Sequence, residues 1–155
     1  MKIRVQIDES IEEDEIIIRS RVLDAEIQRL LEQIQLLQQS TLRHMIGTDE
    51  DRQYVLDVKD ISYFETQGDY VYAVQGRKQY RLSFRLYELE QQLPQDRFMR
   101  ISKSVILNIG NIAHIEPTLG TPFLAKLRDG AESVYISRQY IKALRHKIMG
   151  GISDA

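Results

Sequence analysis

Hydrophobic and polar residues at the start of the chain follow the period of a β-strand. β-Branched residues alternate with polar ones over residues 2–8, which predicts a half-buried strand. After an acidic linker, residues 15–21 are again rich in β-branched side chains and predict a second short strand. The competing interpretation is a helix that begins at Ser10, because Ser10 and Glu13 have the spacing of a capping box.

Helical spacing replaces this alternation after Asp24, a residue type that is common at helix N-caps. The predicted helix ends near Gln39, and its apolar positions are Ile27, Leu30, Leu31, Ile34 and Leu37. A helix of this length is marginal alone in water, so its apolar stripe must be buried against its own domain or against a second copy. Identical stripes can cover each other, and we therefore expect a symmetric homodimer.

Turn-forming residues at positions 47–51 mark a predicted boundary between an N-terminal module, residues 1–45, and a second domain, residues 46–150. The module is expected to serve dimerisation or regulation. Beyond the boundary, short strand patterns alternate with small turns, and they cover residues 53–57, 61–66, 70–75 and 79–83.

Helical spacing returns twice in the second domain. Residues 85–93 predict a short helix that Pro94 ends, and residues 138–147 predict a last helix with Ser137 as its N-cap. The prediction is an α+β fold, in which a β-rich domain with short helices follows a small module of strand and helix.

The stretch of residues 98–112 combines a core pattern with a group of hydrogen-bond donors. Arg100, Lys103 and Ser104 interrupt the apolar run and could be held toward solvent by a rigid scaffold. Such a fixed group of donors is suited to recognising an anion. The apolar positions that can enter a core are Ile101, Val105, Leu107 and Ile109.

Composition limits the possible classes of protein. A chain of 155 residues accommodates one ordinary domain and a small appendage. It contains no cysteine, and its three histidines are far apart, so we expect no disulfide, metal site or cofactor. We find no signal peptide and no apolar run long enough to cross a bilayer, and we therefore expect a cytoplasmic protein.

The formal net charge of −2 hides an uneven distribution along the chain. Residues 1–50 carry 6 Lys and Arg against 11 Asp and Glu, a net charge of −5. Residues 77–147 carry 13 basic against 6 acidic side chains, a net charge of +7. This division predicts an acidic appendage and a basic working domain, although scattered basic residues can also be merely solvated.

The order of several motifs resembles the LytTR-type DNA-binding domain of the LytR/AlgR family. The matching motifs are Tyr63-Phe-Glu65, Phe98-x-Arg-Ile-Ser-Lys-Ser-x-Ile-Leu-Asn108, Ile112-x-x-Ile115 and Ile136-Ser-Arg-Gln-Tyr140. The resemblance spans roughly residues 45–147, and several ordered matches across one domain make coincidence improbable.

The resemblance implies a β-rich domain that inserts loops into successive major grooves of double-stranded promoter DNA. By the family pattern, the base-contacting positions lie near Asp69 and Tyr70, at Lys103 and at Arg138. The family often has a basic or imidazole side chain in the first of these loops, where this chain has Asp69 and Tyr70.

The chemistry of these residue types agrees with such roles. Arg138 can donate two hydrogen bonds to guanine, and Lys103 can donate to a base edge or to a phosphate. Ser104 and Ser137 suit phosphate contacts that fix the register. Arg77, Lys78 and Arg100 are expected to supply the salt-dependent part of binding.

Plainer explanations exist for the same residues. Arg138 could pair with an acidic side chain on its own surface, Arg100 could form a structural ion pair, and Lys103 could touch phosphate alone. Tyr70 suits cross-strand packing better than base stacking, because aromatic residues are favoured in strands for packing alone.

No enzymatic motif is present: the chain has no glycine-rich phosphate loop and no nucleophile elbow, and no small-molecule substrate is expected. The remaining alternative is a dimeric protein-interaction module of a membrane-associated signalling system.

The resemblance also implies a response-regulator-like role in bacteria. The roughly forty-five residues before the domain are too few for the receiver domain that most relatives carry. We therefore expect control by expression level and by dimerisation or partner binding, with a small membrane protein as a possible partner.

Overall fold

The computed structural model describes residues 1–38, 42–120 and 122–150. The chain divides into two compact units, Met1–Gln39 and Ser40–Ala155. In the first unit, the helix α1 (Ala25–Gln38) follows an irregular segment. The Asp24 carboxylate accepts a hydrogen bond from the Ile27 N–H at 2.9 Å, which confirms the predicted N-cap. The predicted end at Gln39 lies outside the described residues.

The two strands predicted before α1 are wrong for the single chain. Residues 1–23 contain turns and bends but no strand, and none of them forms a backbone–backbone hydrogen bond with a residue of another described segment. The alternation in residues 2–8 has the right period, yet a strand exists only when a neighbouring strand accepts its hydrogen bonds. No helix begins at Ser10 either; its N–H and hydroxyl both donate to Asp8.

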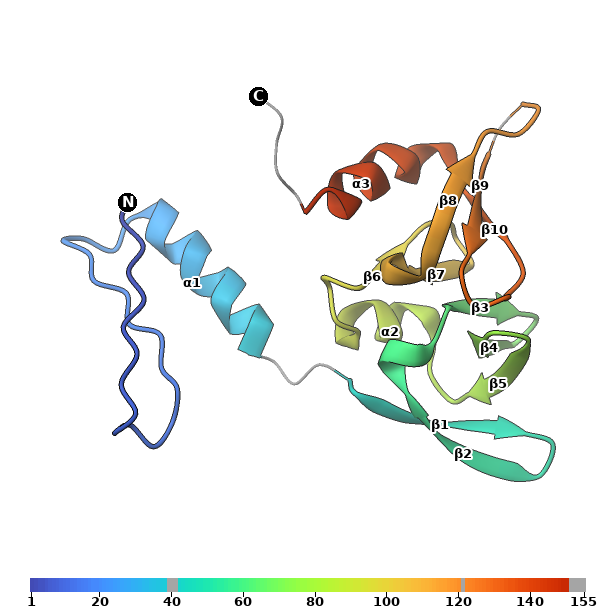
Figure 1. The fold of residues 1–155 in the computed structure, drawn as a ribbon, viewed down its shortest axis with the longest axis horizontal. Coiled ribbons are helices and arrows are strands. Elements are labelled where there is room, and N and C mark those ends of the chain that lie inside the picture. The colour runs from blue at the N-terminus through green and yellow to red at the C-terminus, as the bar shows by residue number, and fades with distance from the viewer. Residues whose placement is uncertain (39–41, 121, 151–155) are drawn as a thin grey trace. The chain divides into compact units, whose positions relative to one another are not determined.

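The second unit begins with two antiparallel hairpins and a short helical turn (Figure 1). The first hairpin joins β1 to β2, and the 3₁₀ turn η1 leads into β3, which continues into the β4–β5 hairpin. The bounds are β1 His44–Asp49, β2 Arg52–Asp57, η1 Val58–Asp60, β3 Tyr63–Gln67, β4 Tyr70–Gln75 and β5 Lys78–Leu82. The strands predicted from the sequence after residue 52 are confirmed within one or two residues at each end.

The interpretation of Gly47 as a turn residue is wrong, because Gly47 lies inside β1 opposite Tyr54. A Cβ at this position would lie 2.6 Å from the Cβ of Tyr80 and 2.7 Å from Cδ1 of Leu56. Glycine is therefore required for close packing between strands, and the reversal occurs after it, at Glu50, whose φ is 54°.

The remaining elements complete a large and a small sheet. The bounds are α2 Leu86–Gln92, β6 Phe98–Arg100, β7 Val105–Asn108, η2 Ile109–Asn111, β8 Ile112–Glu116, β9 Phe123–Leu127, β10 Val134–Ile136 and α3 Arg138–Ile148. The large sheet has the order β2-β1-β5-β4-β3-β7-β6, and the small sheet has the order β10-β9-β8. Both helices predicted in this unit are confirmed.

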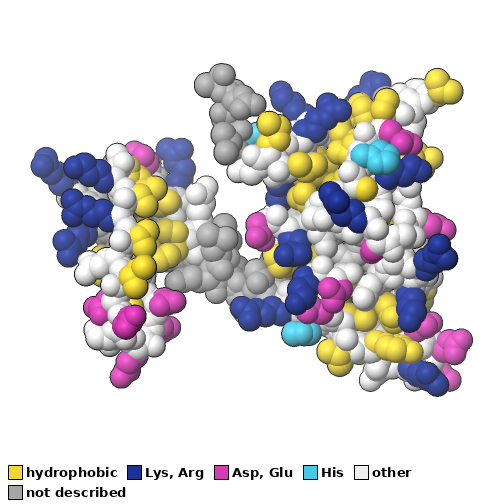
Figure 2. Space-filling model, in the orientation of Figure 1, with side chains coloured by type: hydrophobic (Ala, Val, Ile, Leu, Met, Phe, Trp, Pro, Cys, Tyr) yellow, Lys and Arg dark blue, Asp and Glu magenta, His cyan; other side chains and the backbone are white. Residues whose placement is uncertain are grey.

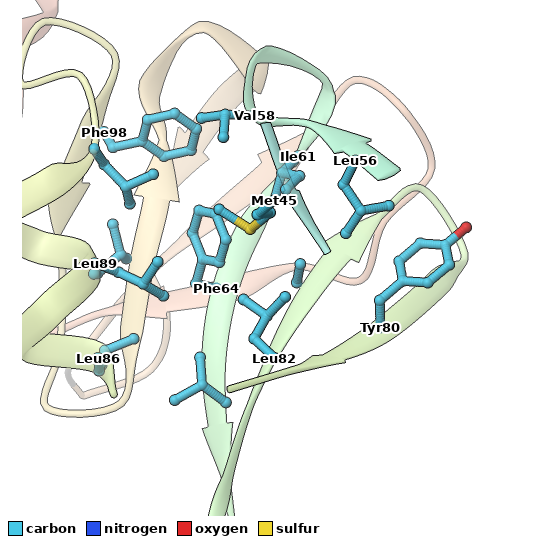
Figure 3. Close-up of a cluster of buried hydrophobic side chains, with 14 residues drawn as sticks. Met45, Leu56, Val58, Ile61, Phe64, Tyr80, Leu82, Leu86, Leu89 and Phe98 are labelled. Atoms are coloured by element: carbon cyan, nitrogen blue, oxygen red, sulfur yellow. The ribbon is translucent and has the colours of Figure 1, made fainter. Parts of the chain in front are cut away.

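The large sheet separates two hydrophobic cores. On one face, Phe64 and Ile106 pack with the leucines of α2, including the fully buried Leu89 (Figure 3). On the other face, Leu107 packs with residues of the small sheet and with Leu144 of α3. Successive residues of β7 therefore point into different cores, which is why every residue of that strand is buried. This double anchoring fixes the loop that precedes β7.

No helix in the described part of the chain is long and apolar enough to cross a membrane.

Candidate nucleic-acid interface

Three loops that carry predicted site residues lie at neighbouring ends of core strands. The first is the turn between β3 and β4, which contains Asp69. The second, residues 101–104, connects β6 to β7, and the third connects β10 to α3 at Ser137. The structure thus brings together parts of the chain that are about seventy residues apart.

Two backbone hydrogen bonds connect these loops. The Thr66 N–H donates to the Ser104 carbonyl at 2.9 Å, which attaches the second loop to the end of β3 beside the first loop. The Ser137 N–H donates to the Ile101 carbonyl at 2.9 Å, which attaches the start of α3 to the second loop. Ile101 itself is fully buried. The loops are therefore held by backbone bonds and core packing rather than by their exposed side chains.

Side chains from the second and third loops line one open depression. Its lining residues are Ser102, Lys103, Ser104, Ser137, Arg138 and Gln139. Lys103 and Arg138 are both exposed, and the described structure shows no ion pair for either. Two cations and three hydroxyl groups on one concave surface can bind an anionic ligand of extended shape.

The start of α3 adds further donors to this surface. Ser137 is the N-cap, as predicted, but its side chain forms no capping hydrogen bond. Its hydroxyl and the first N–H groups of the helix are therefore available to a ligand. The partial positive charge of a helix N-terminus favours an anion at this place.

Arg100 supports the second loop from inside. Its Nε donates to the Ser102 carbonyl at 2.7 Å, and its Nη2 donates to the Lys103 carbonyl. Its Nη1 lies 2.8 Å from Oε2 of Glu90 on α2, and its side chain is only 21% exposed. All three guanidinium nitrogens therefore contact protein acceptors. The expected phosphate contact of Arg100 competes with these bonds.

Asp69 and Tyr70 are exposed at the first loop. The turn between β3 and β4 consists of Gly68, with a φ of 61°, and Asp69, which agrees with the preference for glycine at the first position of two-residue hairpins. The guanidinium of Arg81 on β5 lies 4.8 Å from the centroid of the Tyr70 ring. Arg81 thus brings a positive charge to a loop whose own charged residue is acidic.

Arg77 and Lys78 lie at the opposite end of β4 from Asp69 and Tyr70. A strand of this length separates the two turns by roughly 17 Å. The turn at Gly76 is attached to the small sheet instead, because the Gly76 N–H donates to the Asp129 carboxylate at 3.1 Å. The structure therefore does not place Arg77 and Lys78 on the surface that carries Lys103 and Arg138.

Arg81 and Lys142 are basic residues near the site that the sequence did not single out. Lys142 is exposed and lies one helical turn after Arg138 on α3. Its spacing of four residues from Arg138 was visible in the sequence and places both side chains on one helix face. The position of Arg81 beside Tyr70 depends on strand register, and no local pattern indicates it.

Comparison with known proteins gives the family of this fold. The model of the family described as LytTr DNA-binding domain matches residues 51–149. The chain belongs to the LytTR family. The matched range contains every strand and helix of the second unit except β1, and all three loops of the site.

Individual relatives agree with this assignment. A protein of Staphylococcus aureus strain NCTC 8325, named as an HTH-type transcriptional regulator, is 29% identical over 150 residues, which cover 96% of this chain and 98% of the relative. A protein of S. aureus strain MSSA476 with the same type of name is 33% identical over 106 residues, 67% of this chain and 69% of the relative. The similarity to the first relative thus includes the N-terminal unit.

A solved structure confirms the α+β fold. The LytTr DNA-binding domain of a methyl-accepting/DNA response regulator from Bacillus cereus superimposes with a TM-score of 0.62 and 25% sequence identity. The match covers 70% of this chain and 98% of that domain. The LytTR resemblance inferred from the motifs is therefore confirmed.

Proposed function

We propose that this protein regulates transcription by binding promoter DNA with the three loops described above, inserted into the major groove. The observation that carries the proposal is the shared depression that holds Lys103 and Arg138 at the end of the large sheet. The names of the relatives as transcriptional regulators support the regulatory part of the proposal. Bacterial DNA lies in the cytoplasm, which is where we propose that the protein acts.

The residues divide into base readers and phosphate contacts. Arg138, exposed on the first turn of α3, presents a planar fork that suits guanine O6 and N7. Lys103 reads a base edge or binds a phosphate as a point charge. Ser104, Ser137 and the free N–H groups of α3 bind phosphate and fix the register.

The first loop contributes differently from the other two. Asp69 can accept a hydrogen bond from cytosine N4, and Tyr70 is 51% exposed. Arg81 balances the charge of Asp69 and can bind a phosphate beside Tyr70. Arg77 and Lys78, at the far end of β4, make at most a peripheral contribution.

A recognition helix is not the reading element in this proposal. The helices of the described chain are separated by strands, and α2 and α3 are not joined by a short turn. The start of α3 approaches DNA together with the loops rather than lying along the groove by itself.

The test is binding of the purified protein to its own upstream DNA and to random DNA, at two salt concentrations. A discrete complex that prefers the upstream fragment and weakens steeply with salt supports the proposal. Equal affinity for both DNAs at every salt concentration contradicts it. Salt-insensitive capture of a protein partner instead would favour the alternative, a protein-interaction module of a membrane-associated system.

A further inference from the structure

The N-terminal unit leaves an apolar row without cover. Ile3, Val5 and Ile7 are 90%, 85% and 88% exposed, although they alternate with polar residues as in a half-buried strand. The backbone N–H and C=O groups of residues 2–7 also form no hydrogen bond with another described residue. The segment therefore has both a free apolar face and free backbone donors and acceptors, which is the surface that strand pairing with another chain uses.

The charges explain why this segment does not pair within its own chain. The chain reverses after Glu9, so the basic residues Lys2, Arg4, Arg19 and Arg21 lie toward one end of the unit. The acidic residues between positions 8 and 15 lie toward the other end. Figure 2 shows the Lys and Arg side chains of this unit in its upper half and most of its Asp and Glu side chains in the lower half. A hairpin about this turn would place Ile7 opposite Glu12 and Val5 opposite Asp14, so two of the three apolar side chains would face carboxylates, which is unfavourable.

We propose that residues 2–8 pair in antiparallel orientation with the same residues of a second copy. Antiparallel pairing about a two-fold axis at Val5 places Ile3 opposite Ile7 and Lys2 opposite Asp8 of the second copy. Every apolar side chain of the segment then lies on one face. The basic start of each segment meets the acidic end of the other, so the charge pattern that prevents pairing within one chain favours pairing between two.

The same unit offers a surface for the apolar face of the paired strands. A groove of about 450 Å³ lies between the segment before α1 and the helix itself. Its apolar lining residues are Ile16, Ile18, Val22, Leu23, Ile27, Leu31 and Ile34. A two-stranded ribbon alone is marginal in water, and burial of its apolar face in the grooves of the two copies supplies the missing stabilisation.

The absence of cysteine permits a direct test by disulfide formation. In full-length protein without DNA, Val5→Cys places two thiols across the proposed axis, at a separation that a disulfide bridges. Under mild oxidation we expect most of the chains to become covalent dimers. Leu119→Cys, in an exposed loop of the second unit, is the matched control and should remain monomeric in a denaturing gel. Equal cross-linking of both variants, or of neither, overturns the proposal.

A charge exchange tests the orientation. Sedimentation equilibrium of the wild type should give twice the mass of one chain. Lys2→Asp and Asp8→Lys each place like charges opposite one another, and each should weaken self-association by about fivefold or more. The double variant exchanges the two charges and should restore the wild-type constant. A monomeric wild type, or a double variant that stays as weak as the single variants, overturns the proposal. Because DNA takes no part in either assay, failure here leaves the DNA-binding proposal untouched.

Discussion

The guanidinium of Arg100 lies 2.8 Å from the carboxylate of Glu90 and also binds the backbone carbonyls of Ser102 and Lys103. Arg100 thereby connects α2 to the loop that carries Lys103. Arg100→Ala removes these bonds, and we expect the free energy of unfolding to fall by about 1–2 kcal/mol. DNA affinity should fall on the order of tenfold, because the loop loses its fixed shape. Urea unfolding and DNA titration measure the two effects.

Two comparisons separate support of the loop from direct phosphate contact. Glu90→Gln removes the ion pair but leaves both carbonyl bonds, so its effect on DNA affinity should be much smaller. The dependence of affinity on salt should keep its slope in Arg100→Ala if Arg100 acts only through the loop. A slope reduced by about 1 would show that Arg100 neutralises a phosphate itself.

Gly47 should not tolerate even a methyl group. A Cβ there would lie 2.6 Å from Tyr80 Cβ, which belongs to a buried residue and cannot move alone. We expect Gly47→Ala to lower the free energy of unfolding by about 1–3 kcal/mol. Gly110→Ala is the control, because its Cβ would meet its nearest neighbour, Oδ1 of Asn108, at an ordinary 3.5 Å. Urea unfolding that shows equal stability for both variants would contradict this explanation.

Asp129 should make the fold sensitive to acid. Partial burial raises the pKa of this carboxyl. The hydrogen bonds that it accepts from Ser62, the Ala131 N–H and the Gly76 N–H together lower the pKa by more than burial raises it. The pKa of Asp129 therefore lies below the ordinary value. A lowered folded-state pKa adds stability above the unfolded-state pKa, near 4, and the addition is lost as pH falls through the folded-state value.

Asp129→Asn should therefore cost roughly 1 kcal/mol of unfolding free energy at pH 7, because an amide cannot replace the charged acceptor. The difference from wild type should shrink below about pH 4. Urea unfolding at pH 7 and pH 3 measures it, with Asp51→Asn in the exposed β1–β2 turn as the control. A difference that stays constant with pH would contradict the assigned role of the charge.

The comparison of sequence and structure shows which information is local. Gly68 and Gly76 adopt the positive φ that tight turns require, and Pro94 prevents the preceding helix from continuing. The hairpins and the end of α2 could therefore be predicted from these residues alone. Gly47 was misread as a turn residue because its close neighbour, Tyr80, is distant in the sequence. The role of Arg100 was left open because its partner, Glu90, lies on another element. Residues 2–8 show the same limit: the period is correct, but the chain itself contains no partner strand.

Only part of the candidate site could be predicted, because its loops are joined by contacts between residues that are distant in the sequence. The motifs identified Lys103 and Arg138 by resemblance, but the bond between Ser137 and Ile101 that unites their loops depends on tertiary packing. Arg77 and Lys78 look equivalent to the other basic residues in the sequence. Only the direction of β4 shows that they lie at the opposite end of the sheet.

Arg81 should contribute to DNA binding through its charge. Its guanidinium lies over the Tyr70 ring at 4.8 Å, beside the first loop. Arg81→Ala should weaken binding to all DNA sequences and lower the salt slope by about 1, whereas Arg81→Lys should keep most of the slope. Arg77→Ala is the control at the far end of β4, and its slope should stay close to wild type. A larger effect of Arg77→Ala than of Arg81→Ala would mean that a different face of the sheet meets DNA.

Lys103 and Arg138 line the same depression, yet their loss should have different consequences. If Arg138 reads guanine, Arg138→Ala should cost about 1–3 kcal/mol of discrimination at one base pair and reduce the preference for the upstream fragment. Arg138→Lys should not restore this preference, because an ammonium cannot form the two parallel hydrogen bonds.

If Lys103 binds phosphate, Lys103→Ala should weaken binding to specific and to random DNA equally and reduce the salt slope by about 1. Titrations of both variants against single-base-pair substitutions at several salt concentrations distinguish the two roles. Loss of sequence preference in Lys103→Ala would make it a base reader, and unchanged preference in Arg138→Ala would exclude Arg138 from that role.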